Sequence, residues 1–131
     1  MTFVSIIGVF VWFIGLVIEA VADQQKFLFR LDPKNRGKWV NKGLWSVSRH
    51  PNYFGEILCW VGVYIFAAPM LNGFRDVLGL LSPVLITLLL LKFSGVPVVE
   101  AEADRKYGRY KSYWNYSRST SLLIPRRPKK D

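Results

Sequence analysis

Five side chains that can do chemistry follow one another within eight residues, at the mouth of an apolar segment. They are a guanidinium, an imidazole, a carboxamide, a phenol and a carboxylate, supplied by Arg49, His50, Asn52, Tyr53 and Glu56. Each of these groups is costly at a lipid boundary unless it has a partner. A ligand that carries phosphates and polar rings would supply such partners. The block therefore predicts a ligand site.

Anchoring at the headgroup layer is the alternative explanation for this block. It accounts for Arg49 and Tyr53, because cationic and aromatic side chains favour the interface between lipid and water. It does not account for Asn52 and Glu56, which gain nothing from that interface. We therefore favour a ligand site over anchoring alone.

Other kinds of site have little support in the sequence. A structural zinc site uses four nitrogen or sulfur ligands, whereas this chain has one His and one Cys. The acids Glu56, Glu100 and Asp104 could hold a hard cation, but their spacing does not demand one. Cys59 lies in an apolar run, and the glycine-rich loops that cradle phosphates in soluble nucleotide-binding folds are missing. We therefore expect no metal.

The elements that must position this block are membrane helices. Hydrophobic residues make up 51% of the chain, yet its net charge is +9. This combination is typical of a membrane protein with charged loops rather than of a soluble nucleic-acid binder. Three runs are long and apolar enough to cross a bilayer, residues 3–22, 54–71 and 77–91. We expect an all-α membrane protein, a single domain over residues 1–131, with no nucleic-acid partner.

The first run resembles a signal peptide in one respect, because Ala20-Val21-Ala22 looks like a cleavage site. It lacks a basic start and contains Glu19, so we interpret it as a span. Of the 18 Lys and Arg residues, 17 lie either between the first two spans or after the third. The positive-inside rule places both of those segments in the cytosol and the N-terminus outside. The predicted ligand site then faces the cytosol.

A further helix is expected after the third span. Pro97 suits its first turn, and acidic residues followed by basic residues complement the helix dipole. Aromatic residues recur at helical spacing in the set Ala103, Tyr107, Tyr110 and Trp114. The predicted architecture is about three transmembrane helices plus a cytosolic amphipathic C-terminal helix. The basic tail, residues 125–131, is expected to be mobile.

The first span is expected to continue as a helix past the membrane, through Asp23, Lys26 and Arg30, and two acids lie near the end of its apolar part. Glu19 and Asp23 are four residues apart and share a helix face. Acids at this position oppose the helix dipole and are expensive near lipid. We therefore expect a compensating partner, which is Arg30, Arg49 or a hydroxyl group of a ligand.

Three blocks of the sequence match one protein family in the same order, and they span nearly the whole chain. The first is EAVADQQKF over residues 19–27, and the second is GLWSVSRHPNYFGE over residues 43–56. The third runs from Glu100 through Asp104 and Tyr107 to Leu123-Ile124-Pro125. The chain resembles the steroid 5-alpha-reductase-like membrane proteins, in particular the branch called domain of unknown function 1295. The second block is also similar to sterol C14 reductases and, more loosely, to isoprenylcysteine carboxyl methyltransferases.

The resemblance implies a helical membrane domain that binds NADPH from the cytosolic side. On this chain, Asp23 and Arg30 would meet the adenosine-phosphate part of the cofactor. Lys38 and Arg49 would contact its phosphates, and His50 belongs to the same cofactor-binding block. Cations suit phosphates on chemical grounds as well.

The nicotinamide end of the cofactor is assigned by the same resemblance. Asn52, Tyr53 and Glu56 would lie near it, and Tyr53 and Glu56 are the catalytic candidates. Glu100 and Tyr107 would close the pocket from the C-terminal helix. Carboxylates and amides suit ribose hydroxyls and the carboxamide.

The chain departs from the family in length. Reductases of this family are about twice as long, and their N-terminal spans supply much of the substrate pocket and an acid–Tyr pair that donates a proton. This chain begins where that half would end. Three explanations are open: a fragment, the product of a split gene or a reduced homologue. In the first two cases the chain is a cofactor-binding half that works with a separate N-terminal half.

Three functions remain open at this point. The first is hydride transfer from NADPH to the β-carbon of an activated C=C bond in a steroid, sterol or enoyl lipid. The second is a membrane methyltransferase that uses S-adenosylmethionine, although Asn52 and Glu56 favour the reductase. The third is a non-catalytic membrane module that holds a lipid or a partner. The expected location is the endoplasmic reticulum or a bacterial inner membrane.

Overall fold

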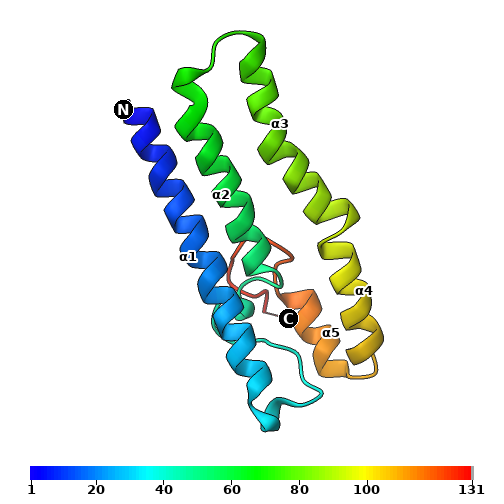
Figure 1. Cartoon of the computed structure of the whole chain (residues 1–131). Helices are drawn as coiled ribbons and strands as arrows, with labels where there is room; N and C mark the ends of the chain where they lie inside the picture. The colour runs from blue at the N-terminus through cyan, green and yellow to red at the C-terminus, as the bar shows by residue number, and fades with distance from the viewer. Residues whose placement is uncertain (131) are drawn as a thin grey trace.

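The structure is a computed structural model that describes residues 1–130, and every regular element in that range is helical. Three helices are long and apolar enough to cross a membrane: Phe3–Leu31, Pro51–Met70 and Phe74–Tyr107. They stand side by side, and the chain reverses direction from each to the next (Figure 1). This arrangement confirms the predicted all-α fold with three membrane-spanning helices.

The first span, α1 (Phe3–Leu31), is longer than the apolar run that predicted it. It begins where the Thr2 hydroxyl accepts a hydrogen bond of 3.1 Å from the Ser5 backbone N–H. At a rise of about 1.5 Å per residue it is roughly 44 Å long, beyond the ~30 Å hydrocarbon core of a bilayer. The extra turns carry Lys26 and Arg30 past the apolar segment, as the charged residues after residue 22 indicated.

The second span, α2 (Pro51–Ala67) with the short η3 (Ala68–Met70), packs on α1 through glycines. A Cβ added at Gly62 would lie 2.4 Å from the Trp12 backbone nitrogen. One added at Gly15 would lie 2.6 Å from the Gly55 carbonyl oxygen. The two backbones therefore approach too closely for any side chain there, as in many membrane helix pairs.

The third span is composite. It joins α3 (Phe74–Leu88), the π-helical η4 (Leu89–Phe93) and α4 (Val96–Tyr107). The helix is interrupted at Ser94 and Gly95, and Pro97 lies in the first turn of α4, as predicted. The Ser94 N–H bonds the Leu89 carbonyl five residues back at 2.9 Å. This interruption separates the apolar α3 from the charged α4.

The amphipathic C-terminal helix is not continuous. The Gly108 N–H bonds the Asp104 carbonyl and ends α4, and a separate helix, α5 (Lys111–Ser119), begins after Tyr110. Tyr107 and Trp114 therefore do not share one uninterrupted helix face, contrary to the spacing argument.

The connection between α1 and α2 contains two short 3-10 helices, η1 (Pro33–Asn35) and η2 (Gly43–Ser46). The tail beyond α5, expected to be mobile, is tied back to the end of this connection. The Arg49 N–H bonds the Ser121 carbonyl at 2.8 Å, and the Arg126 N–H bonds the Val47 carbonyl at 3.1 Å. The tail therefore helps to hold the segment that leads into α2, residues 47–50, which is the mouth of α2.

Candidate functional site

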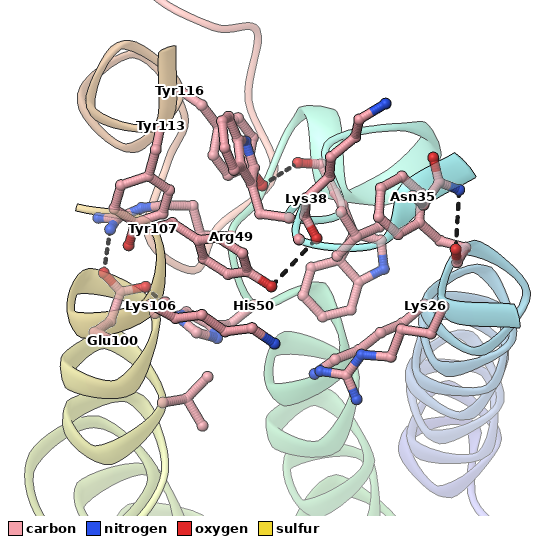
Figure 2. A pocket seen from close by; sticks show the side chains of 18 of the residues that line it. Lys26, Asn35, Lys38, Arg49, His50, Glu100, Lys106, Tyr107, Tyr113 and Tyr116 are labelled. Atoms are coloured by element: carbon pink, nitrogen blue, oxygen red, sulfur yellow. Dashed lines mark hydrogen bonds and ion pairs between the residues drawn. The ribbon is translucent and has the colours of Figure 1, made fainter. Parts of the chain in front are cut away.

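A cavity of about 520 Å³ lies at the end of the bundle where α1 and α4 end. Its walls come from α1, the segment between η1 and η2, the mouth of α2, α4 and α5 (Figure 2). Lys26 on α1 and Lys106 on α4 lie on opposite walls. The cationic residues of the lining are Lys26, Arg30, Arg36, Lys38, Arg49 and Lys106.

The charge in this lining is unbalanced. Its only acid is Glu100, and that carboxylate already holds Arg49 and His50. Within residues 1–130, none of the other five cations forms an ion pair. Two of them lie over aromatic rings instead, Lys26 at 5.1 Å from the Trp45 ring centroid and Lys106 at 5.3 Å from that of Tyr107. The cavity therefore favours a ligand with several negative charges.

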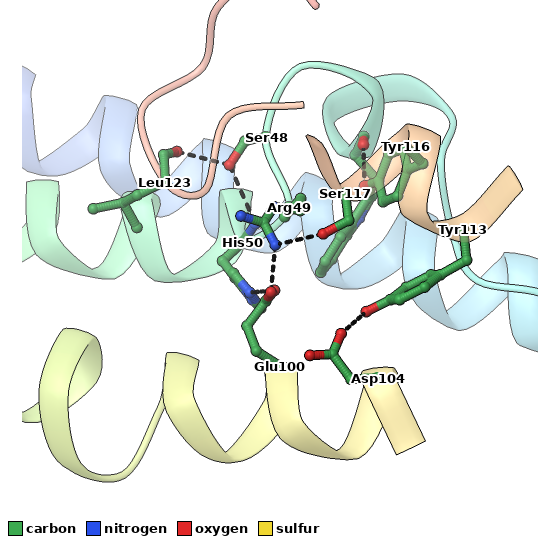
Figure 3. A network of polar contacts seen from close by, with 10 residues as sticks. Ser48, Arg49, His50, Glu100, Asp104, Tyr113, Tyr116, Ser117 and Leu123 are labelled. Carbon is green, nitrogen blue, oxygen red and sulfur yellow. Dashed lines mark hydrogen bonds and ion pairs between the residues drawn. The ribbon is translucent and has the colours of Figure 1, made fainter. Parts of the chain in front are cut away.

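Glu100 joins α4 to the mouth of α2 (Figure 3). One carboxylate oxygen lies 2.6 Å from His50 Nε2, and the other accepts a hydrogen bond from an Arg49 guanidinium nitrogen. The same nitrogen donates to Ser117 Oγ on α5 at 3.1 Å. His50 is buried, and its backbone N–H donates to Ser48 Oγ at 3.2 Å. Three separated segments therefore meet around the ion pair of Glu100 with Arg49.

Aromatic side chains complete the wall. Trp39 contacts Tyr107 and Tyr113 edge-on, with ring centroids 5.6 and 5.4 Å apart. The Tyr113 hydroxyl donates to Asp104 at 2.6 Å, and burial together with this contact raises the pKa of Tyr113 above its usual range. The phenol therefore stays protonated, as a hydrogen-bond donor, to a higher pH than an ordinary tyrosine.

Tyr116 is held in the same way. Its hydroxyl donates to the Trp45 carbonyl at 2.5 Å, and burial raises the pKa of Tyr116. Trp45 in turn donates its indole N–H to the Ala22 carbonyl on α1 at 2.9 Å. This chain of contacts fixes α5 and the mouth of α2 against α1.

Two donors of the lining lack a partner. Arg49 Nε and Trp39 Nε1 are buried and form no hydrogen bond with any described residue. Both residues line the cavity. An unsatisfied buried donor costs about 1–3 kcal/mol, so an acceptor on a ligand would relieve this cost.

The structure gathers six of the ten residues that the sequence assigned to a cofactor. The residues found in the cavity lining are Arg30, Lys38, Arg49, His50, Glu100 and Tyr107. Glu100 and Tyr107 reach the cavity from α4, although they lie far along the sequence from the other four residues.

The other four, Asp23, Asn52, Tyr53 and Glu56, do not line this cavity. Tyr53 stacks on His50, with ring centroids 5.5 Å apart, so it supports the lining from behind. The Asn52 Oδ1 atom is buried without a partner. The reason for the separation is that α2 begins at Pro51, so Asn52, Tyr53 and Glu56 project from a helix, whereas the part of the block that lines the cavity ends at His50.

The acids at the end of the first span lack two of the three partners expected for them, and a hydroxyl group of a ligand stays a prediction. Within residues 1–130, neither Glu19 nor Asp23 forms an ion pair with Arg30 or Arg49. Glu19 packs beside Gly55 on α2, where a Cβ on the glycine would lie 2.6 Å from the Glu19 backbone nitrogen. Arg49 is instead engaged by Glu100 from α4.

Several lining residues were missed by the sequence analysis. Lys26 precedes Arg30 by four residues on α1, and this i to i+4 spacing was a usable signal. The others carry no local signal of a shared site, because they come from separate segments: Arg36, Trp39, Trp45, Lys106, Tyr113 and Tyr116. As for metals, residues 1–130 contain no group of three or more His, Cys, Asp or Glu side chains that could hold an ion.

Comparison with known proteins gives one broad match and one partial match. The family model described as "Protein of unknown function (DUF1295)" matches residues 1–120. A curated relative, the probable O-methyltransferase ustE of Ustilaginoidea virens, is 33% identical over 66 residues. That match covers 50% of this chain and 23% of the relative, so the chain aligns with less than a quarter of that protein. No solved structure matches significantly.

Proposed function

We propose that this chain, which belongs to the DUF1295 family of steroid 5-alpha-reductase-like proteins, binds NADPH in the cation-lined cavity. The observation that carries the proposal is the unbalanced charge of the lining. Five cations without an acidic partner surround a space that also has an aromatic wall. Few ligands other than a polyphosphorylated nucleotide meet both conditions.

The residues present fit such a cofactor. Arg30, Arg36 and Arg49 offer planar forks that hold phosphate oxygens through paired hydrogen bonds, and Lys26 and Lys106 act as point charges. The orphaned donors of Arg49 and Trp39 would find acceptors on the ligand. The cavity volume of about 520 Å³ falls within the roughly 300–1,000 Å³ common for ligand sites.

The proposed reaction is reduction of an activated C=C bond in a steroid, sterol or enoyl lipid. NADPH, when bound, supplies the hydride. The chain binds and orients the cofactor: cations neutralise its phosphates, and Glu100 holds Arg49 and His50 in the wall. We propose Tyr53 and Glu56 on α2 as the catalytic residues, Asn52 as a contact near the nicotinamide end, and Asp23 as a contact of the adenosine-phosphate part.

The setting of this reaction is a bilayer. The three span-length apolar helices support a membrane protein, and a hydrophobic substrate would reach the site from the lipid. We propose that the cavity faces the cytosol, in the endoplasmic reticulum or a bacterial inner membrane. We also propose that a separate N-terminal half completes the substrate pocket and donates the proton.

A methyltransferase is the second candidate, favoured by the printed name of the partial relative. S-adenosylmethionine carries a sulfonium cation and no phosphate. A lining with five unpaired cations would repel the sulfonium and leave the cations unsatisfied. The charge of the cavity therefore favours NADPH over the methyl donor.

Calorimetry on the purified protein in detergent tests the choice. Titration with NADPH, NADH and S-adenosylmethionine should show the tightest binding for NADPH and clear weakening in high salt, because the contacts are ionic. A preference for S-adenosylmethionine would reject the reductase. If no nucleotide binds, the chain is a non-catalytic module that holds a lipid or a partner.

A further inference from the structure

Trp39 occupies an unusual place beside the cavity. It contacts Tyr107 and Tyr113 edge-on and Tyr110 at a tilt, with a centroid distance of 6.3 Å to Tyr110. None of these rings stacks parallel to it. Trp39 also belongs to the segment that lines a second cavity of about 500 Å³. The residue is half-buried and borders open space, so it is not enclosed in a core.

The indole N–H of Trp39 adds a second, independent observation. Trp39 Nε1 is buried and has no hydrogen-bond partner among residues 1–130. Buried tryptophans usually find an acceptor for this group. Trp45, by comparison, donates its N–H to the Ala22 carbonyl, and Trp114 donates to the Gly108 carbonyl. Among these three, the donor of Trp39 is the one left for a ligand.

The surroundings hold Trp39 in place before any ligand arrives. The Tyr107 hydroxyl donates to the carbonyl of the neighbouring Lys38 at 3.2 Å. The Tyr113 ring that packs on the indole is fixed by its own bond to Asp104. A preorganised aromatic surface loses little conformational entropy when a ligand binds.

The side chains around Trp39 indicate which part of a ligand would bind there. Arg36 and Lys38 precede it closely in the sequence and line the same cavity without acidic partners. Inorganic phosphate or a phospholipid headgroup would satisfy these cations but would leave the indole and its N–H unused. A ligand that carries a planar base close to phosphate groups would use all of them.

We infer that Trp39 is the binding residue for the adenine base of the nucleotide, with its ring against the base and its N–H donating to an acceptor on the base or ribose. Arg36 and Lys38 then hold the phosphate next to that ribose. This inference rests on the proposed function and deepens it, because it assigns the adenosine end of the cofactor to the segment between η1 and η2.

The test compares two probes on the purified protein in detergent: 2′,5′-ADP, which has a base, and inorganic tripolyphosphate, which has none. Trp39→Leu should weaken binding of 2′,5′-ADP by about tenfold and change binding of tripolyphosphate by less than about twofold. Trp39→Phe keeps a ring but lacks the N–H, so its loss should be intermediate. Trp60→Leu is the matched control, since Trp60 is exposed on α2 outside the cavity.

Fluorescence gives a second measurement that needs only the mild Phe variants. Binding of 2′,5′-ADP should change the tryptophan emission of the wild-type protein and of Trp60→Phe. The change should be clearly smaller in Trp39→Phe than in Trp45→Phe, because Trp45 lines the same cavity but already donates its N–H to Ala22. An undiminished change in Trp39→Phe would overturn the assignment of Trp39.

The possible failures are distinguishable. If the wild-type protein binds neither NADPH nor 2′,5′-ADP, the proposed function fails and the inference falls with it. If the wild-type protein binds both and Trp39→Leu binds 2′,5′-ADP equally well, only the inference fails. Equal weakening for 2′,5′-ADP and tripolyphosphate would also overturn it, because Trp39 would then merely support the cavity.

Discussion

Glu100 is the residue on which the geometry of the cavity depends. One half-buried carboxylate engages both Arg49 and His50, which come from the mouth of α2. Removing one partner of a buried ion pair leaves the other charge buried without compensation. The resulting loss of stability is larger than the net contribution of the intact pair.

Glu100→Gln should therefore lower both stability and NADPH affinity. A carboxamide cannot balance a guanidinium, and Arg49 would lose its charged partner. We expect a loss of roughly 1–3 kcal/mol in the free energy of unfolding, measured by thermal unfolding in detergent. Glu102→Gln is the matched control, because Glu102 is exposed on the same helix. Equal unfolding temperatures for the two variants would contradict this role of Glu100.

Arg49→Lys tests the guanidinium itself. Arg49 bonds Glu100 and Ser117 through one nitrogen and keeps a buried Nε free for a ligand. An ammonium cannot reproduce this fork. NADPH binding should weaken by about 1–2 kcal/mol, on the scale of a charged hydrogen bond. Calorimetry should show no comparable change for Arg105→Lys, on the outer side of α4. Unaltered affinity in Arg49→Lys would remove Arg49 from the site.

At the scale of elements, the glycine-lined contact between α1 and α2, the α1–α2 seam, determines where the residues at the polar end of the bundle lie. Glycines on both helices bring the backbones together, and α1 can then present Lys26 opposite α4 and bring Arg30 into the cavity lining. The interruption of the third span at Gly95 matters for the same reason. It separates the lipid-facing α3 from α4, which carries Glu100 and Tyr107 to the cavity.

Gly62→Ala should destabilise this seam. Its Cβ would meet the Trp12 backbone and the Gly8 carbonyl at 2.4–2.8 Å, and backbone atoms cannot move aside. We expect a loss of about 1–3 kcal/mol from overpacking. Gly79→Ala on α3 is the control, because the nearest atom is the mobile end of Leu71. Thermal unfolding in detergent compares them, and an equal or smaller loss for Gly62→Ala would be inconsistent with a close α1–α2 contact.

At the scale of the whole molecule, charge and apolar surface divide the chain into a lipid-facing part and a polar end. Large apolar side chains of α1 remain exposed along its length, such as Phe10 at 64%. Lys and Arg residues concentrate in the α1–α2 connection and after the third span. Both of those segments meet at the cavity. The positive-inside rule therefore predicts that the cavity faces the cytosol.

Cysteine labelling tests this orientation. Cys59 is replaced by Ala, and single cysteines are placed at Asn72 and at Lys34, both of which are exposed. An impermeant thiol reagent added to intact cells should label Asn72→Cys and leave Lys34→Cys unmodified until the membrane is opened. Labelling of Lys34→Cys from outside would reverse the proposed orientation.

The sequence by itself determined the three spans, their turns and the presence of a polar block at the mouth of the second helix. Hydropathy is a local property, because a run of apolar residues must be buried in lipid whatever its neighbours are. The length of α1 beyond residue 22 and the start of α4 near Pro97 were also readable, since helix periodicity and proline preferences act over a few residues.

Only the tertiary structure decided which polar residues share a cavity. The block from Arg49 to Glu56 looks continuous in the sequence, but the helix that begins at Pro51 divides it, so that His50 lines the cavity while Glu56 does not. Trp39, Lys106 and Tyr113 join the site from three separate segments. Their meeting depends on close packing of whole helices and on long-range contacts such as that of Glu100 with Arg49, and no local pattern of residues encodes those distances.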